Sequence, residues 1–399
     1  MAYLDHAATT PLRPEARDAI AAHLDLVGNA SSLHASGRAA RRVVEEARES
    51  IAADLGARPS EVVFTGGGTE ADNAALKGLF WTRHELDPRR RRILCSPVEH
   101  HAVLDPVRWL ESSGQADVTW LDVDRAGRVL PDTLGAALER WGDEVAYATC
   151  MWANNEVGTV SDVAGLAGAA RTAGVPFHTD AVQAVGILDV RFAASGADTL
   201  ALTAHKVGGP YGVGALLVRP GVTLTPLSHG GGQERDLRSG TLDPPGAAGF
   251  AAALRAAMAE RESSVARIGE LRDALVSGVL AAVPDAVLNG EPDLSATEPI
   301  RRLPGNAHLS FPGCEGDALL MLLDAQGVEC STGSACSAGV ARPSHVLVAL
   351  GADTAHARSS LRFSLGHTTT RADVDAAVAA IGPAVERARR AGALAASRA

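Results

Sequence analysis

The sequence predicts an α/β fold in which a mostly parallel central sheet is covered by helices and followed by a smaller α+β part. The first observation is the alternation of short apolar segments with helical segments from about residue 40 to 245. Such a βαβ rhythm places strands in parallel and helices on both faces of the sheet. The second is the composition, since 399 residues with 46% hydrophobic side chains are typical of a globular enzyme with a large core.

The same pattern predicts where the individual elements lie. In the first part, helices are expected at 39–55 and 70–81, and strands at 61–64, 92–95, 145–148, 175–178, 199–202 and 214–218. An alanine-rich helix over 246–282 follows a Pro-Pro-Gly break and is expected to lead into the second part. There, strands are expected at 306–311 and 360–365, helices at 316–326 and 371–390, and a frayed end at 391–399.

The charge and the cysteines exclude several classes of protein. A formal net charge of −10 argues against broad binding of nucleic acids. The N-terminus has no basic and apolar segment typical of secretion, and the longest apolar runs, such as 318–323, are too short to span a bilayer. The five cysteines form no CxxC pair and have no zinc-like spacing, so we expect reduced thiols, no metal site and a cytoplasmic location.

Residues 64–70 (FTGGGTE) describe a strand that ends in glycines and continues into a helix. Glycines let backbone amides approach an anion closely, and a helix N-terminus adds a favourable dipole and free N–H groups. Thr69 is suited to cap this helix and to donate its hydroxyl to a phosphate. A glycine-rich turn with a capping threonine is an equally good interpretation, and a nucleotide-binding loop is unsupported because no lysine follows the glycines.

Two further strand ends carry residues suited to pyridoxal phosphate. Asp180 follows a predicted strand, where a carboxylate is able to hold the cationic ring nitrogen of that cofactor, although capping of the next helix is the commoner use of such a residue. Lys206 ends another strand beside Thr203 and His205, which is a poor place for a solvated charge and a good one for a Schiff base. With the glycine turn, these residues supply anchors for the aldehyde, the ring nitrogen and the phosphate.

Two of the cysteines differ in their surroundings. Small residues flank Cys336, which predicts an exposed, flexible loop and a reactive thiol, whereas Cys330 follows an apolar pair and is predicted to be structural. The segment at 229–232 is similar to an oxyanion motif of esterases. A hydrolase of that fold is excluded, because the chain has no G-x-S-x-G nucleophile motif.

Six segments together resemble the cysteine desulfurases of the NifS/IscS class, within the class V aminotransferase superfamily. They are YLDHAATTP (3–11), GNASSLH (28–34), EHHAVL (99–104), NNEVG (154–158), RSGT (238–241) and SLG (364–366). The resemblance extends over nearly the whole chain, and the combination of segments is very specific.

The resemblance implies a fold-type-I pyridoxal-phosphate enzyme that converts L-cysteine to L-alanine and transfers the sulfur to one of its own cysteines as a persulfide. It implies a large cofactor-binding domain at 16–250 and a small domain made of 1–15 and 251–399, which carries the catalytic cysteine loop. It also implies a homodimer with active sites at the subunit interface. The expected partners are sulfur-acceptor proteins of iron–sulfur cluster assembly or of tRNA thiolation.

The resemblance also implies a role for each matching residue. Lys206 matches the Schiff-base lysine, Asp180 the partner of the ring nitrogen, and His100 the histidine that stacks on the ring and is the candidate base for the catalytic thiol. Cys336 matches the persulfide-forming cysteine, and Arg362 the arginine that binds the substrate carboxylate. Asn155 and Gln183 match the partners of the ring hydroxyl, and Asn155 also matches a substrate-binding residue. The residues that match phosphate contacts are Gly68, Thr69, Thr203 and His205. Thr241 matches the phosphate contact that the neighbouring subunit donates.

Some alternatives stay open in the sequence. The phosphate turn reads GGGT where many relatives carry SGAT, and His367 replaces a frequent arginine. A selenocysteine lyase or a class V aminotransferase is an alternative within the enzyme class, and a scaffold that docks sulfur acceptors is an alternative of another class. The basic segment at 387–390 favours a scaffold, although a solvated helix end also explains it.

Overall fold

The computed structural model describes residues 1–296, 298–332 and 343–396. Only β8 of the seven-stranded central sheet runs antiparallel to its neighbours, and the other strand pairs are parallel. The predicted α/β fold with a mostly parallel sheet is therefore confirmed. The order of the strands is β2 (Val62–Thr65), β8 (Gly214–Val218), β7 (Thr199–Thr203), β6 (Phe177–Asp180), β5 (Val145–Thr149), β3 (Arg92–Cys95) and β4 (Asp117–Trp120).

Helices cover both faces of this sheet, and for this reason the residues of its central strands are buried. Successive residues of β7 point to opposite faces: Ala201 packs against α3 and α4, whereas Leu200 packs into the core of the other face. The helices on the first face are α3 (Gly68–Leu86) and α4 (His101–Ser112). Those on the second face are α2 (Ala35–Asp54), α5 (Pro131–Trp141) and α6 (Val163–Thr172).

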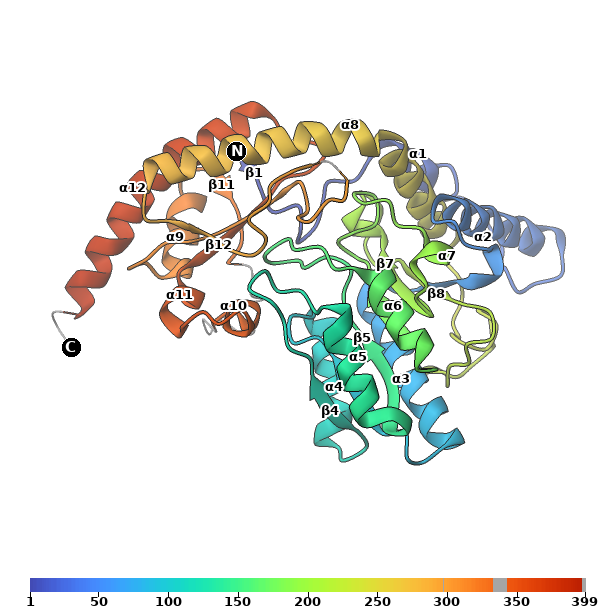
Figure 1. Ribbon diagram of the computed structural model, residues 1–399. Coiled ribbons are helices and arrows are strands. Elements are labelled where there is room, and N and C mark those ends of the chain that lie inside the picture. The colour runs from blue at the N-terminus through green and yellow to red at the C-terminus, as the bar shows by residue number, and fades with distance from the viewer. Residues whose placement is uncertain (297, 333–342, 397–399) are drawn as a thin grey trace.

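α8 (Pro244–Ala282) is a single helix of 39 residues that contributes to two separate hydrophobic cores. Phe250 in its first half belongs to the core of the central sheet, and Leu275 in its second half belongs to the core of the C-terminal part. Figure 1 shows this helix along the upper edge of the molecule, over both parts. Short elements complete the first part, namely α1 (Pro14–Ala21), η1 (Pro59–Glu61), η2 (Gly142–Glu144), α7 (Phe192–Ser195) and η3 (Ala204–Lys206).

The C-terminal part also contains the first residues of the chain. β1 (Ala2–Tyr3) pairs in parallel with β11 (Val328–Glu329), and Figure 1 places the N-terminus among the C-terminal elements. The domain boundaries expected at 16–250 and at 1–15 plus 251–399 stay a prediction. The other elements of this part are the antiparallel strands β12 (Ser360–Ser364), β10 (Asn306–Ser310) and β9 (Val287–Leu288), and the helices α9 (Gly316–Asp324), α10 (His345–Ala349), α11 (Thr354–Arg358) and α12 (Arg371–Ala396).

The elements differ from the predicted ones in several places. The strand expected at 175–178 is β6, two residues later, because Pro176 has no N–H to donate and takes part only through its carbonyl, which accepts from Ala148 at 2.9 Å. The fraying expected at 391–399 is wrong for 391–396, where α12 continues to Ala396; apart from Gly392, these residues are alanine or leucine, which have high helix propensity. The pattern does not predict β4, α1, α4, α5 and α6. Among the described residues, no helix is both long and apolar enough to cross a membrane.

Candidate active site

A cavity with an empty volume of about 580 Å³ lies at the carboxyl ends of β5, β6 and β7. Open α/β sheets bind their ligands at this position. The predicted cofactor-binding residues other than Thr241 all line it. The full lining is Gly68, Thr69, Asp72, His100, Ala102, Met151, Asn155, Asp180, Val182, Gln183, Thr203, His205 and Lys206.

The turn between β2 and α3 forms one wall of the cavity. Gly67 has a φ of 144°, which residues with a side chain rarely adopt. A Cβ atom on Gly68 would lie 2.9 Å from Cγ2 of Val182, so a side chain here would require Val182 to shift. The first N–H groups of α3 have no partner within the helix and, together with the helix dipole, favour an anion. The turn therefore fits a phosphate group.

Asp180 ends β6 in a buried position, with 4% of its surface exposed. Its Oδ1 accepts a hydrogen bond from the backbone N–H of Val182 at 2.8 Å. Burial raises the pKa of Asp180 to about 8, and the nearby carboxyl of Asp72 adds to the shift. Among the described residues, no lysine, arginine or histidine side chain forms an ion pair with Asp180. A cationic ligand such as a pyridinium ring would supply the missing partner.

Lys206 is one of two lysines in the chain, and the other, Lys77, lies on α3 with its Nζ 4.7 Å from the ring centroid of Trp109. Burial lowers the pKa of Lys206 to about 8, and the charge of Arg362 contributes. Its Nζ donates to the carbonyl of Ala7 at 2.5 Å and to that of the next residue at 2.6 Å. A buried amine with a lowered pKa is suited to attack an aldehyde.

His100 forms the N-cap of α4. Its Nδ1 accepts a hydrogen bond from the backbone N–H of Ala102 at 3.1 Å, so the proton of the neutral imidazole is assigned to Nε2. Burial lowers the pKa of His100 to about 4, and the charge of Lys206 acts in the same direction. His100 is therefore neutral at pH 7 and presents an N–H rather than a lone pair at Nε2. Its predicted role as the base for the catalytic thiol stays a prediction, and it requires the proton to move to Nδ1.

Arg362 lies on β12, outside the lining of this cavity but in contact with it. Its Nη1 donates to the backbone carbonyl of Asn155 at 2.9 Å, and its Nη2 donates to Oδ1 of Asp5 at 2.8 Å. The sequence did not predict that Asp5 contacts Arg362. Nor did it predict that the carbonyl of Ala7, which accepts from Lys206, also accepts a hydrogen bond from Nε2 of Gln183 at 2.9 Å. The only available signal was the resemblance of the segment at 3–11, which says nothing about these contacts.

Two predicted residues are not part of this cavity. Thr241 lines a separate cavity of about 430 Å³ together with Gly66 and Arg238, and its contact with a neighbouring subunit stays a prediction. Cys336 lies in the segment 333–342, outside the described residues. Cys330 is buried after β11, and burial raises the pKa of its thiol to about 12, which fits the structural role predicted for it.

The comparison with known families agrees with this geometry. Residues 2–377 match the aminotransferase class-V family. The chain belongs to this family. An IscS-like cysteine desulfurase of Mycobacterium tuberculosis is 59% identical to this chain over 391 residues, which are 98% of each chain. A cysteine desulfurase IscS of Dictyoglomus turgidum is 43% identical over 374 residues, which are 94% of this chain and 91% of the relative.

Solved structures of similar proteins have the same fold over nearly the whole chain. A structure named NifS-like protein has a TM-score of 0.86 at 33% identity and covers 97% of this chain and 100% of its own chain. A complex of SspA with cysteine has a TM-score of 0.77 at 32% identity and covers 92% of this chain and 99% of its own. The predicted resemblance and the fold that it implies are therefore confirmed.

Class-V aminotransferases are pyridoxal-phosphate enzymes, and three features of this structure fit that cofactor. The turn at Gly68 fits the phosphate, the buried Asp180 carboxyl lacks a cation that the ring nitrogen would supply, and Lys206 is the lysine that lines the cavity. The chemistry of these residues therefore fits the group.

Proposed function

We propose that this member of the aminotransferase class-V family is a pyridoxal-phosphate-dependent cysteine desulfurase, which converts L-cysteine to L-alanine and passes the sulfur to Cys336. The observation that carries the proposal is the single cavity that contains the Lys206 amine, the phosphate turn and the buried carboxyl of Asp180. Relatives named cysteine desulfurase, which are 59% and 43% identical over nearly the whole chain, support it.

The cavity residues divide the work of holding the cofactor and moving a proton. Asp180 would hold the ring nitrogen, the turn at Gly68 the phosphate, and Lys206 the aldehyde. When bound, the cofactor supplies an electron sink for the Cα atom of the substrate. Lys206, whose pKa is about 8, has a share of neutral amine at neutral pH and would act as the base that takes the Cα proton of the substrate.

Arg362 and Asn155 are proposed to bind the substrate carboxylate. The Nε–H of Arg362 is buried and has no hydrogen-bond partner among the described residues, so it is a donor that still lacks an acceptor. The Nη1 group is held by the Asn155 carbonyl, which fixes the plane of the guanidinium. A carboxylate is the anion whose two oxygens match this fork of donors.

The sulfur step is proposed to occur on Cys336. Its thiolate attacks the substrate sulfur, so that an S–S bond forms and the Cβ–S bond breaks. The electron pair of the broken bond stays with the carbon, which is protonated to give alanine. L-Cysteine and one enzyme thiol thus yield L-alanine and one persulfide, and the balance needs no external oxidant.

Mass spectrometry after incubation with L-cysteine tests the proposal. The expected result is one additional sulfur atom on the peptide that contains Cys336, together with L-alanine in the supernatant. Cys336→Ala should retain the coloured cofactor and lose sulfide release, whereas Cys330→Ala should retain both. A persulfide on Cys330 alone, or normal turnover by Cys336→Ala, would contradict the assignment.

The same assay separates the alternative functions. An aminotransferase acting on L-cysteine would produce 3-mercaptopyruvate, which keeps the sulfur, and a selenocysteine lyase would still turn over selenocysteine after Cys336→Ala. A scaffold would bind sulfur acceptors without turning over cysteine.

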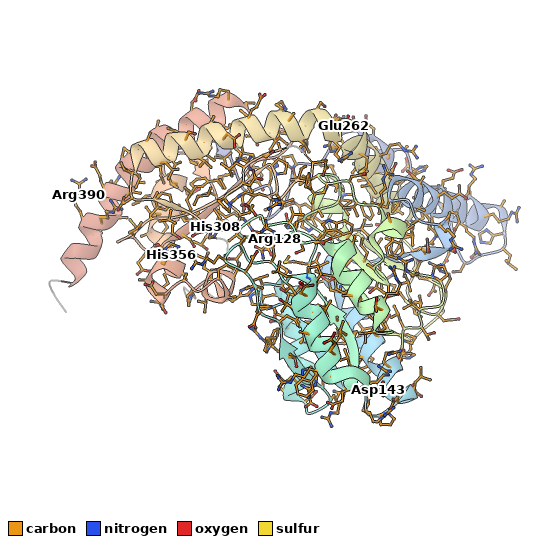
Figure 2. The ribbon with its side chains drawn as sticks, viewed as in Figure 1. Arg128, Asp143, Glu262, His308, His356 and Arg390 are labelled. Carbon is orange, nitrogen blue, oxygen red and sulfur yellow. The ribbon has the colours of Figure 1, made fainter. Side chains whose placement is uncertain are left out.

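The basic segment at 387–390, which is the feature that favours a scaffold, lies on α12. Figure 2 shows Arg390 on the outer part of this helix. The neighbouring Arg389 donates hydrogen bonds to the Asp285 carboxylate at 2.7 Å and to the Pro312 carbonyl at 2.9 Å.

The proposed enzyme is a cytoplasmic homodimer that delivers sulfur to acceptor proteins of iron–sulfur cluster assembly or tRNA thiolation. In the dimer, Thr241 would contact the phosphate held by the other subunit. Light scattering should therefore give twice the mass of the chain, and Thr241→Ala should weaken cofactor binding without changing that mass. A monomer with full cofactor affinity would contradict this arrangement.

A further inference from the structure

The cavity wall contains a second acidic side chain, Asp72, that the proposed function does not use. Asp72 follows Gly68 by one turn of α3, so the two residues lie on the same face of the helix. It is 0% exposed, and it lines the same cavity as Asp180 and Lys206.

One oxygen of Asp72 has a partner and the other has none among the described residues. Oδ1 lies 3.1 Å from Nε2 of His178, and Nδ1 of the same imidazole lies 2.9 Å from Oγ1 of Thr199. Oδ2 is buried without a hydrogen-bond partner. A buried and unpaired carboxyl oxygen is unfavourable unless a ligand compensates for it.

The contact with His178 connects Asp72 to the residue that faces the ring nitrogen. His178 and Asp180 are two positions apart on β6, so both point to the face covered by α3. The carboxyl of Asp72 contributes to the raised pKa of Asp180, which means that the two groups interact through the interior of the protein. The imidazole thus contacts Asp72 and belongs to the same face of β6 as Asp180.

The other titratable groups around this pair are Glu99 and Lys206. Glu99 follows β3 and is fully buried, and burial raises the pKa of its carboxyl well above the ordinary range. Its Oε1 accepts from the backbone N–H of Met151 at 2.6 Å. Burial likewise raises the pKa of the Asp72 carboxyl well above its ordinary range, so this carboxyl needs a cation beside it to ionise. Asp72 and Asp180 line the cavity and Glu99 does not, so Asp72 and Asp180 are the carboxyl groups placed to face a cation.

We propose that Asp72 is a positioning residue for the ring nitrogen of the cofactor. With a pyridinium cation bound, its carboxylate would add a second negative charge beside Asp180, and its contact with His178 holds the imidazole between the helix and the strand. A pyridinium cation in the cavity favours the ionised form of Asp72, whereas a ring without the nitrogen does not. The inference rests on the proposed function, because it needs pyridoxal phosphate in this cavity.

Two cofactors distinguish this role from a structural one. The affinity of the ligand-free protein is measured for pyridoxal phosphate and for its 1-deaza analogue, in which carbon replaces the ring nitrogen. Asp72→Asn should weaken binding of pyridoxal phosphate by about tenfold, equivalent to about one pKa unit at the ring nitrogen. It should leave binding of the analogue unchanged.

The matched control is Asp198→Asn. Asp198 precedes β7 and accepts a hydrogen bond from the backbone N–H of Phe177 at 2.9 Å, at the start of β6 and therefore at the opposite end of the strand from Asp180. This variant also removes a carboxyl group beside β6, and it should change the affinity for neither cofactor. If Asp72→Asn does not fold, Asp72→Ser takes its place in the same comparison.

Two results would overturn the inference and leave the proposed function intact. Equal affinities of Asp72→Asn and the wild type for pyridoxal phosphate would mean that Asp72 does not act on the ring. Equal losses for both cofactors would mean that Asp72 supports only the fold. A wild type that binds neither cofactor would instead contradict the proposed function itself.

Discussion

The carboxylate of Asp5 accepts a hydrogen bond from Nη2 of Arg362 at 2.8 Å, although 357 positions separate the two residues in the sequence. The Arg362 side chain is 5% exposed and that of Asp5 is 21% exposed, so the ion pair is largely shielded from water. Asp5 thus occupies part of the guanidinium that is proposed to bind the substrate carboxylate, and the two carboxylates compete for the same positive charge.

Asp5→Asn should therefore lower the KM for L-cysteine. The asparagine oxygen still accepts the hydrogen bond, but its neutral side chain no longer repels the substrate carboxylate. We expect a decrease of about fivefold, which corresponds to about 1 kcal/mol for a partly exposed pair. Asp375→Asn is the control, because it removes one partner of an exposed ion pair of the same length, 2.8 Å to Arg371. An unchanged or increased KM would show that Asp5 does not compete with the substrate.

Borohydride reduction should fix pyridoxal phosphate to Lys206 and nowhere else. Since the chain has two lysines, Lys206→Ala leaves Lys77 and the N-terminal amine as the remaining candidates. We expect a reduced adduct in the wild type and in Lys77→Ala, and none in Lys206→Ala. Peptide mapping of each reduced protein gives the site, and an adduct in Lys206→Ala would exclude the assignment.

The stability of the ligand-free protein should depend on pH through Asp180. Its pKa is raised to about 8 in the folded chain, so between about pH 4 and pH 8 the folded state keeps a proton that the unfolded state has lost. The contribution of Asp180 to stability therefore falls as the pH rises through this window, by at most about 1.4 kcal/mol per pH unit.

Asp180→Asn removes this pH-dependent contribution to stability, because an amide does not titrate. The free energy of unfolding of the variant minus that of the wild type should therefore increase from pH 4 to pH 8, as measured by urea titration of both proteins at each pH. The Asp375→Asn protein should follow the wild type. A difference between Asp180→Asn and the wild type that stays constant with pH would contradict the raised pKa.

His100 has two roles that substitutions should separate: it caps α4, and its imidazole lines the cavity. Asparagine is a good N-cap and alanine is a poor one, so His100→Ala should lose about 1 kcal/mol of unfolding free energy while His100→Asn should lose little. Both variants lack the imidazole and should lose desulfurase activity to the same extent. Thermal unfolding and alanine production measure the two effects independently. Activity retained by His100→Asn would mean that the cap, and not the imidazole, is what the reaction needs.

Much of the fold and the cavity could be predicted because the relevant signals are local. Strands recur as short apolar segments, and parallel strands place their carboxyl ends at one edge, so Asp180 and Lys206 could be expected to meet. The register of β6 could not be predicted as reliably, because Val175 and Pro176 are as apolar as the strand itself. The ladder begins two residues later because Pro176 has no N–H and because the N–H of Val175 donates to the carbonyl of Ala170 at 3.0 Å.

The contacts that hold the site together leave no local pattern in the sequence. Asp5 meets Arg362, and Asp72 meets His178, through side chains from elements that are distant along the chain. Asp5 follows a two-residue strand and Asp72 lies inside a helix. In the sequence, neither can be told apart from an aspartate that is exposed to solvent. Such pairs become visible only when the elements are placed in space.

The pairing of β1 with β11 has a consequence for the order of events during synthesis. The ribosome releases the first residues long before their partners: Ala2 pairs with Val328, and Asp5 with Arg362. The segment that contacts both Lys206 and Arg362 must therefore remain unpaired while most of the chain emerges. The substrate side of the cavity is completed only after Arg362 has been synthesised, so a nascent chain truncated before Ser360 lacks the arginine that is proposed to bind the substrate carboxylate.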